Sequence, residues 1–395
     1  MKTRLRKQAP GHQPSAYVYQ QENWYVARVE ESFKAAGIQE LADLGAADIE
    51  PTLRGIRFSA DRATLYKINY TSRLLSRCLA PLAVFPCRHA DDLYSAGKAL
   101  PWKDFFIKGR TFAITADVVN SDITDARYTT LRLKDAIADY FTENTGRQRP
   151  DVDTRNPDVR VDVTVLDNRA VISLDTSGEA LHKRGYRELS VSAPMQETVA
   201  AAILHFSRWD KKTPLYDPMC GSGTLLCEAL MAACNIPAGI LRNAFGFQIL
   251  PDFDPALWQQ VRKAADAGIT EIPEGLIAGS DVNPAAVTAA KTNLMGLHYG
   301  GRVSIAQQAF LDIPELENRL IITNPPYGIR MGRDRDLRFF YKCLGDFLKQ
   351  KCRGSTAWIY FGDRDYIKNL GLKTAWKLPL RAGGLDGRLV RYELY

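Results

Sequence analysis

The fold of this chain is decided by the stretch Tyr216-Asp217-Pro218-Met219-Cys220-Gly221-Ser222-Gly223-Thr224, a glycine-rich turn between a short apolar strand and a helix. Apolar runs of strand length recur after it, separated by segments with helical periodicity. The runs cover residues 214–216, 276–279, 303–305, 320–323 and 357–361. Short buried strands that alternate with helices are typical of a parallel sheet covered on both faces. The second half therefore predicts a Rossmann-like α/β domain with a doubly wound, mostly parallel sheet.

The glycine-rich turn predicts a ligand site, because glycines let a ligand approach the backbone beside a helix N-terminus. On its own the turn fits a nicotinamide or nucleotide-phosphate site equally well, but it lacks the Lys-Ser/Thr pair of a P-loop. Asp217 would repel a pyrophosphate and suits a cationic amino group, while Asp281 is placed to accept hydrogen bonds from ribose hydroxyls. Asp312, where a third strand ends, suits an adenine amine, with a cap of the next turn as the alternative.

The spacing between the first two aspartates predicts an insertion. A simple βαβ unit places the second acidic residue about 20 residues after the glycine turn. Asp281 follows Asp217 at a much greater distance, and the extra chain is assigned to residues 235–272.

A second motif, Thr323-Asn324-Pro325-Pro326-Tyr327-Gly328, directly follows the apolar run at 320–322. Two adjacent prolines stop a strand, because neither has an N–H to donate, and they stiffen the backbone. The Asn324 oxygen and a proline carbonyl could then accept both N–H bonds of an exocyclic amine, with the Tyr327 ring stacked on the planar group that carries it. The motif indicates methyl transfer to an amine nitrogen of a nucleobase, and an ordinary turn is the alternative.

Length and composition indicate a cytoplasmic protein of two or three domains, since the chain has 395 residues. No apolar run approaches the roughly 20 residues that span a bilayer. The first residues are basic but no apolar region follows them, so 1–16 are expected to be a basic disordered tail rather than a secretory signal. The 7 cysteines include no Cys-x-x-Cys pair, so neither a disulfide framework nor a metal site is predicted.

The front of the chain predicts an α+β region with an antiparallel sheet, assigned to residues 17–165. Strands are predicted at 24–29, 53–58, 112–119, 159–165 and 170–175, and helices at 31–44, 63–79 and 131–141. The last two strands pair as a hairpin around Asp167-Asn168. A linker is assigned to 166–190 and the second domain to 191–395, in which residues 388–395 alternate like an antiparallel edge strand.

The formal net charge of +7 permits nucleic-acid binding without proving it. Basic residues gather in three clusters, for which contacts to RNA phosphates and solvated faces are equally weighted interpretations. The clusters are Arg54, Arg57, Arg62, Lys67, Arg73 and Arg77; Arg147, Arg149, Arg155 and Arg160; and Lys183, Arg184 and Arg187. If they contact phosphates, RNA affinity will fall steeply with salt.

The two motifs resemble the glycine loop and catalytic motif of class I guanine-N2 RNA methyltransferases. The front third resembles the ferredoxin-like plus THUMP arrangement of these enzymes, with matches at 149–161, at the junction 174–187 and at the helix start 193–197. The bacterial 23S rRNA guanine-N2 methyltransferases of the THUMP type are the group it resembles most. Some chains of that family carry a second methyltransferase domain; this sequence ends without one, so a single reaction is expected.

The resemblance implies an S-adenosylmethionine-dependent enzyme that acts on RNA, 23S rRNA first and tRNA as the alternative, without a membrane or a metal. It implies cofactor contacts at Asp217, Pro218, Gly221, Gly223, Asp281 and Asp312, with Pro194 and Glu197 near the amino-acid end. It also implies that Asn324, Pro325, Pro326 and Tyr327 hold the guanine.

Four alternatives change the substrate or the class of protein. A tRNA guanine-N2 methyltransferase has the same catalytic motif and a THUMP module. An adenine-N6 DNA methyltransferase also uses Asn-Pro-Pro-Tyr but has no need of the front region. A non-catalytic RNA-binding assembly factor is disfavoured because every expected polar residue of the site is present. A nicotinamide dehydrogenase would need a proton relay, and none of the 5 histidines follows a strand of the second domain.

Overall fold

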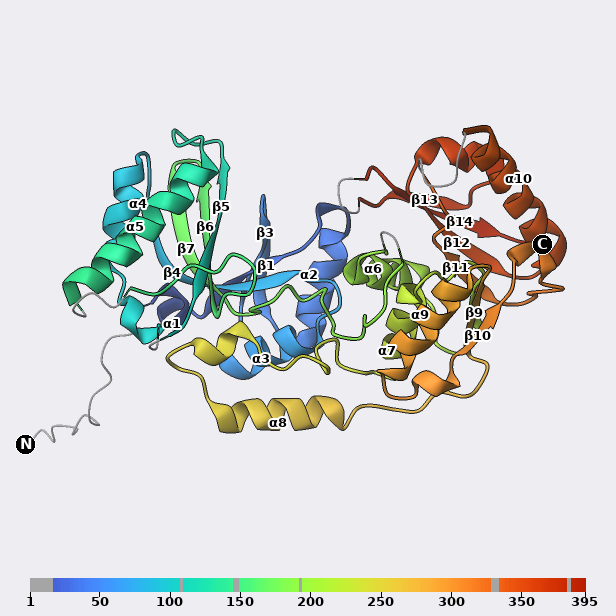
Figure 1. Cartoon of the computed structure of the whole chain (residues 1–395), viewed down its shortest axis with the longest axis horizontal. Coiled ribbons are helices and arrows are strands. Elements are labelled where there is room, and N and C mark those ends of the chain that lie inside the picture. Colours follow the sequence, from blue (N-terminus) through green and yellow to red (C-terminus); the bar gives the residue numbers. More distant parts are fainter. Residues whose placement is uncertain (1–16, 107–108, 145–148, 192–193, 328–333, 382–384) are drawn as a thin grey trace, which may run out of the picture.

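The computed structural model describes residues 17–106, 109–144, 149–191, 194–327, 334–381 and 385–395. The basic tail assigned to 1–16 lies outside these ranges. Two sheets of seven strands each form the cores of a front and a rear part of the molecule, which lie side by side (Figure 1).

The front sheet is continuous across the region assigned to the ferredoxin-like and THUMP modules, in the order β2-β3-β1-β4-β7-β6-β5. Strand β4 joins the two halves, because it pairs with β1 on one side and with β7 on the other. All neighbours are antiparallel except β5 and β6, which run parallel. Its strands are β1 Trp24–Arg28, β2 Ala47–Thr52, β3 Gly55–Ser59, β4 Arg77–Pro86, β5 Phe112–Val119, β6 Val159–Leu166 and β7 Arg169–Asp175.

Within the described residues, five α-helices accompany this sheet: α1 Val18–Glu22, α2 Lys34–Leu44, α3 Arg62–Thr71, α4 Ala90–Ala99 and α5 Ala126–Asn144. The hairpin turn expected between β6 and β7 forms, with Asp167 and Asn168 both in the left-handed region. Because β7 belongs to this sheet, we propose that the front region extends to residue 175 and that the linker begins after it.

The helix predicted over 63–79 is wrong in its second half. Helix α3 ends at Thr71, and residues from Arg77 onward form strand β4. The Glu40 carboxylate of α2 accepts hydrogen bonds from the backbone N–H groups of Arg73 (2.7 Å) and Leu74 (3.2 Å) and from the Ser72 hydroxyl (2.6 Å). The hydrogen bonds of these groups are thus satisfied without a further helical turn, so α3 ends and the chain changes direction.

The rear sheet has the order β10-β9-β8-β11-β12-β14-β13. Its first five strands are parallel, as predicted, and β14 is antiparallel to both of its neighbours. The strands are β8 Leu215–Asp217, β9 Ile277–Asp281, β10 Ser304–Gln307, β11 Leu320–Thr323, β12 Thr356–Phe361, β13 Trp376–Pro379 and β14 Arg388–Glu393. The final strand was expected at an edge, but it lies between β12 and β13.

Both faces of the rear sheet are covered. Along β12, Trp358 and Tyr360 join the core beneath α6 and α7, whereas Ile359 and Phe361 join the core beneath α10. Alternate residues of a strand point to opposite faces, which explains the continuous apolar run. The helices of this part are α6 Glu197–Ser207, α7 Thr224–Ala233, α8 Pro255–Asp266, α9 Pro284–Met295 and α10 Asp334–Lys351.

The insertion expected between β8 and β9 carries α8 and packs against the front part. Helix α8 lies beside α3 (Figure 1). Tyr66 of α3 stacks on Phe247 with 4.5 Å between ring centroids, and Tyr70 donates a hydrogen bond to Asp266 at 2.6 Å. Trp258 packs edge-on against Tyr70. The insertion therefore fastens the rear part to the front part through buried aromatic contacts.

Candidate active site

The two sequence motifs meet at one edge of the rear sheet. Strand β8 lies between β9 and β11, and all three are parallel, so their carboxyl ends lie next to one another. Asp217 ends β8, Asp281 ends β9 and Asn324 directly follows β11. The chain passes from β8 to one side of the sheet and later returns to the other side, and ligands of open α/β sheets bind at such a switch point.

A cavity of about 560 Å³ occupies this edge and is lined by both motifs. The glycine loop contributes Asp217, Pro218, Gly221 and Ser222, and the second motif contributes Asn324, Pro325, Pro326 and Tyr327. The described wall also contains Pro194, Met195, Asp281, Ala309 and Phe310, together with Thr224, Asn283 and neighbouring apolar residues. The two motifs, about a hundred residues apart in sequence, thus border one cavity.

Asp217 is a buried carboxyl group in the wall of the cavity. Burial raises its pKa to about 7, the negative charge of Asp281 adds to the rise, and the Met219 N–H, which donates to Asp217 at 3.1 Å, opposes it. A buried carboxylate without a cationic partner is costly. A positively charged ligand group bound beside Asp217 would offset this cost.

Asp281 fixes the glycine loop and keeps acceptor capacity at the cavity. Its Oδ2 accepts a hydrogen bond from the Gly221 N–H and its Oδ1 from the Asn283 N–H, both at 2.9 Å. Each carboxylate oxygen can accept more than one hydrogen bond, so ribose hydroxyls can still be bound. Gly221 itself has a φ of 54°, a conformation that favours glycine.

Three residues predicted as cofactor contacts do not line the cavity. Gly223 is at the start of α7 with a φ of 82°, and a Cβ there would lie 3.1 Å from that of Ala290, so its role is close packing of α7 on α9. Glu197 is buried and accepts two hydrogen bonds from Arg187. Asp312 is exposed at the end of a short 3₁₀ helix, Phe310–Asp312. Direct contacts by these three residues remain predictions.

Arg187, which the sequence placed in a basic cluster, organises the site instead. Its guanidinium donates to Glu197 (2.8 and 3.0 Å), to the Ser222 hydroxyl (3.3 Å) and to the Met195 carbonyl (3.0 Å). Ser222 and Met195 both line the cavity. Arg187 thus ties the glycine loop to the segment before α6, a role that no local pattern reveals.

Asn324 presents an unused acceptor. Its Oδ1 is buried and has no hydrogen-bond partner among the described residues, although the side chain belongs to the cavity wall. An unpaired buried carbonyl oxygen costs about 1–3 kcal/mol. A ligand that brings an N–H group to this oxygen would remove that cost.

Contacts with α10 and with the end of β12 position Pro326 and Tyr327. The buried Tyr341 hydroxyl of α10 donates to the Pro326 carbonyl at 3.1 Å. The Tyr327 ring lies edge-on to Tyr360, with 6.4 Å between ring centroids, and against the backbone of Gly362. A Cβ at residue 362 would lie 2.5 Å from two atoms of that ring. The position of Tyr327 therefore depends on a glycine at 362.

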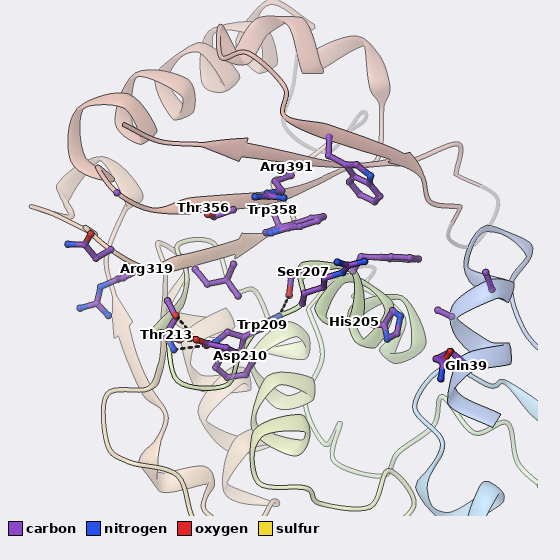
Figure 2. Close-up of a pocket in the computed structure, with 18 residues that line it drawn as sticks. Gln39, His205, Ser207, Trp209, Asp210, Thr213, Arg319, Thr356, Trp358 and Arg391 are labelled. Atoms are coloured by element: carbon purple, nitrogen blue, oxygen red, sulfur yellow. Dashed lines mark hydrogen bonds between the residues drawn. The ribbon is translucent and has the colours of Figure 1, made fainter. Parts of the chain in front are cut away.

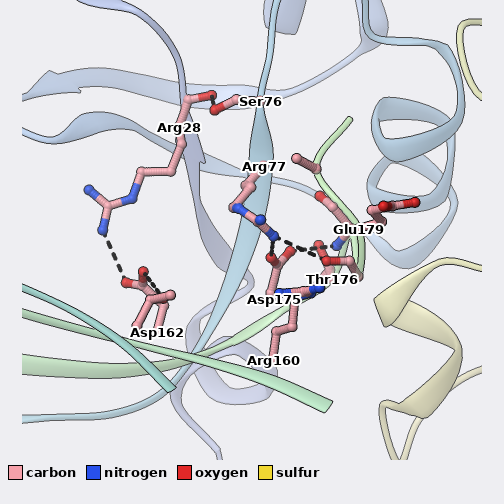
Figure 3. Close-up of polar contacts among 12 residues, drawn as sticks. Arg28, Ser76, Arg77, Arg160, Asp162, Asp175, Thr176 and Glu179 are labelled. Carbon is pink, nitrogen blue, oxygen red and sulfur yellow. Dashed lines mark hydrogen bonds and ion pairs between the residues drawn. The ribbon is translucent and has the colours of Figure 1, made fainter. Parts of the chain in front are cut away.

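The basic clusters are largely engaged within the protein. Arg77 pairs with the buried Asp175, and Arg28, which belongs to none of the clusters, pairs with Asp162 at 3.0 Å (Figure 3). Arg73 donates to the carbonyls of Met231 and Ile236. Arg184, only 1% exposed, pairs with Glu228.

For Arg184 neither interpretation of the basic clusters holds, because its side chain is buried and can face neither an RNA phosphate nor solvent. Arg147 lies outside the described residues. Arg54 and Arg57 are exposed, but they also pair within the protein, with Asp117 at 2.8 Å and with Glu50 at 3.9 Å.

Among the described residues, no cluster of three or more His, Cys, Asp or Glu side chains is arranged to hold a metal ion. Nor does any described helix have the length and apolarity of a membrane span.

Three protein families match successive parts of the chain. Residues 35–79 match the RlmL ferredoxin-like domain, residues 87–175 the THUMP domain, and residues 184–391 the RMKL-like methyltransferase domain.

Relatives share almost the whole length of the chain. A Synechocystis protein named "Putative RNA methyltransferase slr0064" is 38% identical over 94% of this chain and 97% of its own. The "Ribosomal RNA large subunit methyltransferase K/L" of Vibrio parahaemolyticus is 32% identical over 94% of this chain but 53% of its own, so the chain spans about half the length of such relatives. The crystal structure of SMU.472, described as "a putative methyltransferase complexed with SAH", superposes with a TM-score of 0.81 at 27% identity, covering 94% of this chain and 98% of its own.

Proposed function

The chain belongs to the RMKL-like RNA methyltransferases with ferredoxin-like and THUMP domains, which use S-adenosylmethionine, and from this premise we propose that it methylates the exocyclic N2 amine of a guanine in 23S rRNA. The observation that carries the proposal is the cavity shared by the glycine loop and Asn324. This cavity combines a site for a cationic nucleoside with an acceptor for an amine.

The described wall fits S-adenosylmethionine. Asp217 would face its cationic amino group, Asp281 would accept hydrogen bonds from its ribose hydroxyls, and Pro194 and Met195 would flank its amino-acid end. Ala309 and Phe310, which line the cavity after β10, offer an apolar surface for the adenine. When bound, S-adenosylmethionine supplies a methyl group on a sulfonium, which is already a strong electrophile.

The second motif would align and polarise the amine. The Asn324 Oδ1 and the Pro325 carbonyl accept the two N–H bonds, whereas the Pro326 carbonyl is already engaged by Tyr341. These acceptors keep the nitrogen lone pair available and disperse the positive charge that develops on nitrogen. Alignment of this kind can supply roughly 7–11 kcal/mol of the barrier. Tyr327 would stack on the base, which must first leave its helix.

Deletion of the gene, followed by mapping of N2-methylguanine in rRNA and tRNA, tests the substrate. Loss of one modified guanine from 23S rRNA, restored by the wild-type gene but not by an Asn324→Ala gene, is the expected result. Loss of a tRNA modification with intact 23S rRNA would instead identify the tRNA enzyme. Unchanged modification of both RNAs would contradict the proposal.

The affinity for S-adenosylmethionine should depend on pH through Asp217. Because burial raises the pKa of this carboxyl to about 7, it is mostly neutral at pH 6 and mostly ionised at pH 8. The ionised form attracts the cationic ligand, so the dissociation constant should fall by about tenfold between these pH values, in proportion to the ionised fraction. Calorimetric titration of wild type and Asp217→Asn checks this, since the variant should bind weakly and lose the dependence. An equal dependence in the variant would assign it to another group.

Replacing Gly362 by alanine should slow methyl transfer without preventing cofactor binding. The new Cβ would overlap the Tyr327 ring and force it to move. A displacement of about 1 Å at a reacting site can cost about a hundredfold in rate. Single-turnover rates on an rRNA fragment measure the effect, with Gly296→Ala as the control because a Cβ there meets its nearest atom at 3.5 Å. Wild-type rates for Gly362→Ala would show that the ring position is unimportant.

A further inference from the structure

A second large cavity, of about 1020 Å³, lies at the opposite end of the rear strands (Figure 2). Its wall contains Leu320 and Thr356, which begin β11 and β12, together with the end of α6, the loop after it, and Ala36 and Gln39 of α2. Leu320 is four residues before Asn324, a separation of about 13 Å along a strand. This groove therefore cannot hold the base that reacts.

Aromatic rings form one wall of the groove. Trp358 of β12 and Trp376 of β13 are in edge contact, with 5.3 Å between ring centroids, and Phe206 of α6 lies 6.1 Å from Trp376. Trp376 remains 37% exposed, a large value for a tryptophan in a sheet. Trp209 also lines the groove and donates its indole N–H to the Thr213 carbonyl at 2.7 Å, which fixes its ring. Rigid, partly exposed rings are suited to stacking on planar groups.

The charged groups of the wall are predominantly cationic. Arg208, Arg319 and Arg391 line it, and the described wall contains one carboxylate, that of Asp210. Asp210 is engaged by the backbone N–H groups of Lys212 and Thr213 and by the Thr213 hydroxyl. Arg391 pairs with Glu393, so Arg208 and Arg319 supply the excess positive charge.

We propose that this groove binds an unpaired segment of the RNA substrate, with a base stacked on Trp376 and phosphates beside Arg208 and Arg319. Aromatic platforms flanked by cations are the chemistry that single-stranded nucleic acids recognise. The positive charge disfavours the basic residues 1–16 of the chain as an occupant. The inference rests on the chain being an RNA methyltransferase, but it is independent of which RNA atom is methylated.

The test uses the full-length protein and a fluorescein-labelled oligouridine of 12 nucleotides, with affinity measured by fluorescence anisotropy. Trp376→Ala should weaken binding by about tenfold, as expected for loss of one stacked base. Trp376→Phe should retain most of the affinity because a ring remains. The double variant Arg208→Ala/Arg319→Ala should also bind more weakly and show a shallower salt dependence. Lys263→Ala, an exposed cation on α8, is the control and should behave as wild type.

Photocrosslinking with a 4-thiouridine oligonucleotide should label the peptide that contains Trp376. Unchanged affinity and salt dependence in Trp376→Ala and in the arginine double variant would overturn the proposal. The groove would then be a candidate site for a protein partner. Calorimetric binding of S-adenosylmethionine, measured in parallel, should be unaffected by these variants. This measurement distinguishes a loss of RNA binding in the groove from damage to the catalytic site.

Discussion

Replacing Asn324 by alanine is expected to lower the rate of methyl transfer about 100- to 1000-fold, the usual cost of losing one group that stabilises developing charge. The Asn324 Oδ1 is buried in the cavity wall and unpartnered among the described residues, so the amine of the substrate would be its natural partner. The affinity for S-adenosylmethionine should stay near the wild-type value, because the proposed cofactor contacts, Asp217 and Asp281, lie on the neighbouring strands. Incorporation of a labelled methyl group into an rRNA fragment, measured in single turnovers, gives the rate.

Asn324→Asp is the matched control, because a carboxylate keeps an acceptor oxygen at the same position. It should retain more activity than alanine, and both variants should melt near the wild-type temperature. An alanine variant with full activity would show that the amine is held elsewhere. Loss of S-adenosylmethionine binding together with activity would instead indicate that the cavity had collapsed.

The rear fold was predictable because its signals are local. The buried parallel strands β8 and β11 are short apolar runs. Residues with a clear backbone preference follow both strands, Gly221 after β8 and the two prolines at 325 and 326 after β11. The juxtaposition of Asp217, Asp281 and Asn324 then follows from topology, since the carboxyl ends of adjacent parallel strands share one edge.

The front fold was predicted less well because distant contacts decide it. The Glu40 carboxylate, more than thirty residues from Arg73 in sequence, accepts the hydrogen bonds that let α3 end. Strand β4 contains Pro81, where the register with β7 shifts, and a proline inside a run disfavours a strand on local evidence. Strand β2 and helix α4 of the front part were not predicted at all, and neither was strand β13 of the rear part.

The roles of the arginines could not be predicted for the same reason. Arg184 and Arg187 stand three residues apart in a polar, basic segment and look like solvated cations. The structure instead directs Arg187 to Glu197 and the glycine loop, and Arg184 to Glu228. Only the tertiary structure distinguishes a buried guanidinium from an exposed one, because both have the same local sequence signature.

Replacing Arg184 by methionine is expected to cost about 3–5 kcal/mol of unfolding free energy, the usual effect of removing one member of a buried ion pair. Arg184 and Glu228 are 1% and 0% exposed. The guanidinium also donates to the carbonyls of Ser72, Arg73 and Leu181, so it joins the turn after α3 to helix α7 of the rear part. Without it, a carboxylate and three carbonyls would be buried with fewer partners.

Urea unfolding followed by circular dichroism and tryptophan fluorescence measures the loss. Arg184→Met should unfold at a lower urea concentration, and the two probes should separate because the link between the two parts is weakened. The double variant Arg184→Met/Glu228→Leu should recover part of the stability, because it removes the uncompensated charge. Lys98→Met, which breaks the exposed pair with Glu143, is the control and should unfold like wild type. An Arg184→Met protein as stable as that control would mean that the aromatic contacts of the insertion alone join the two parts.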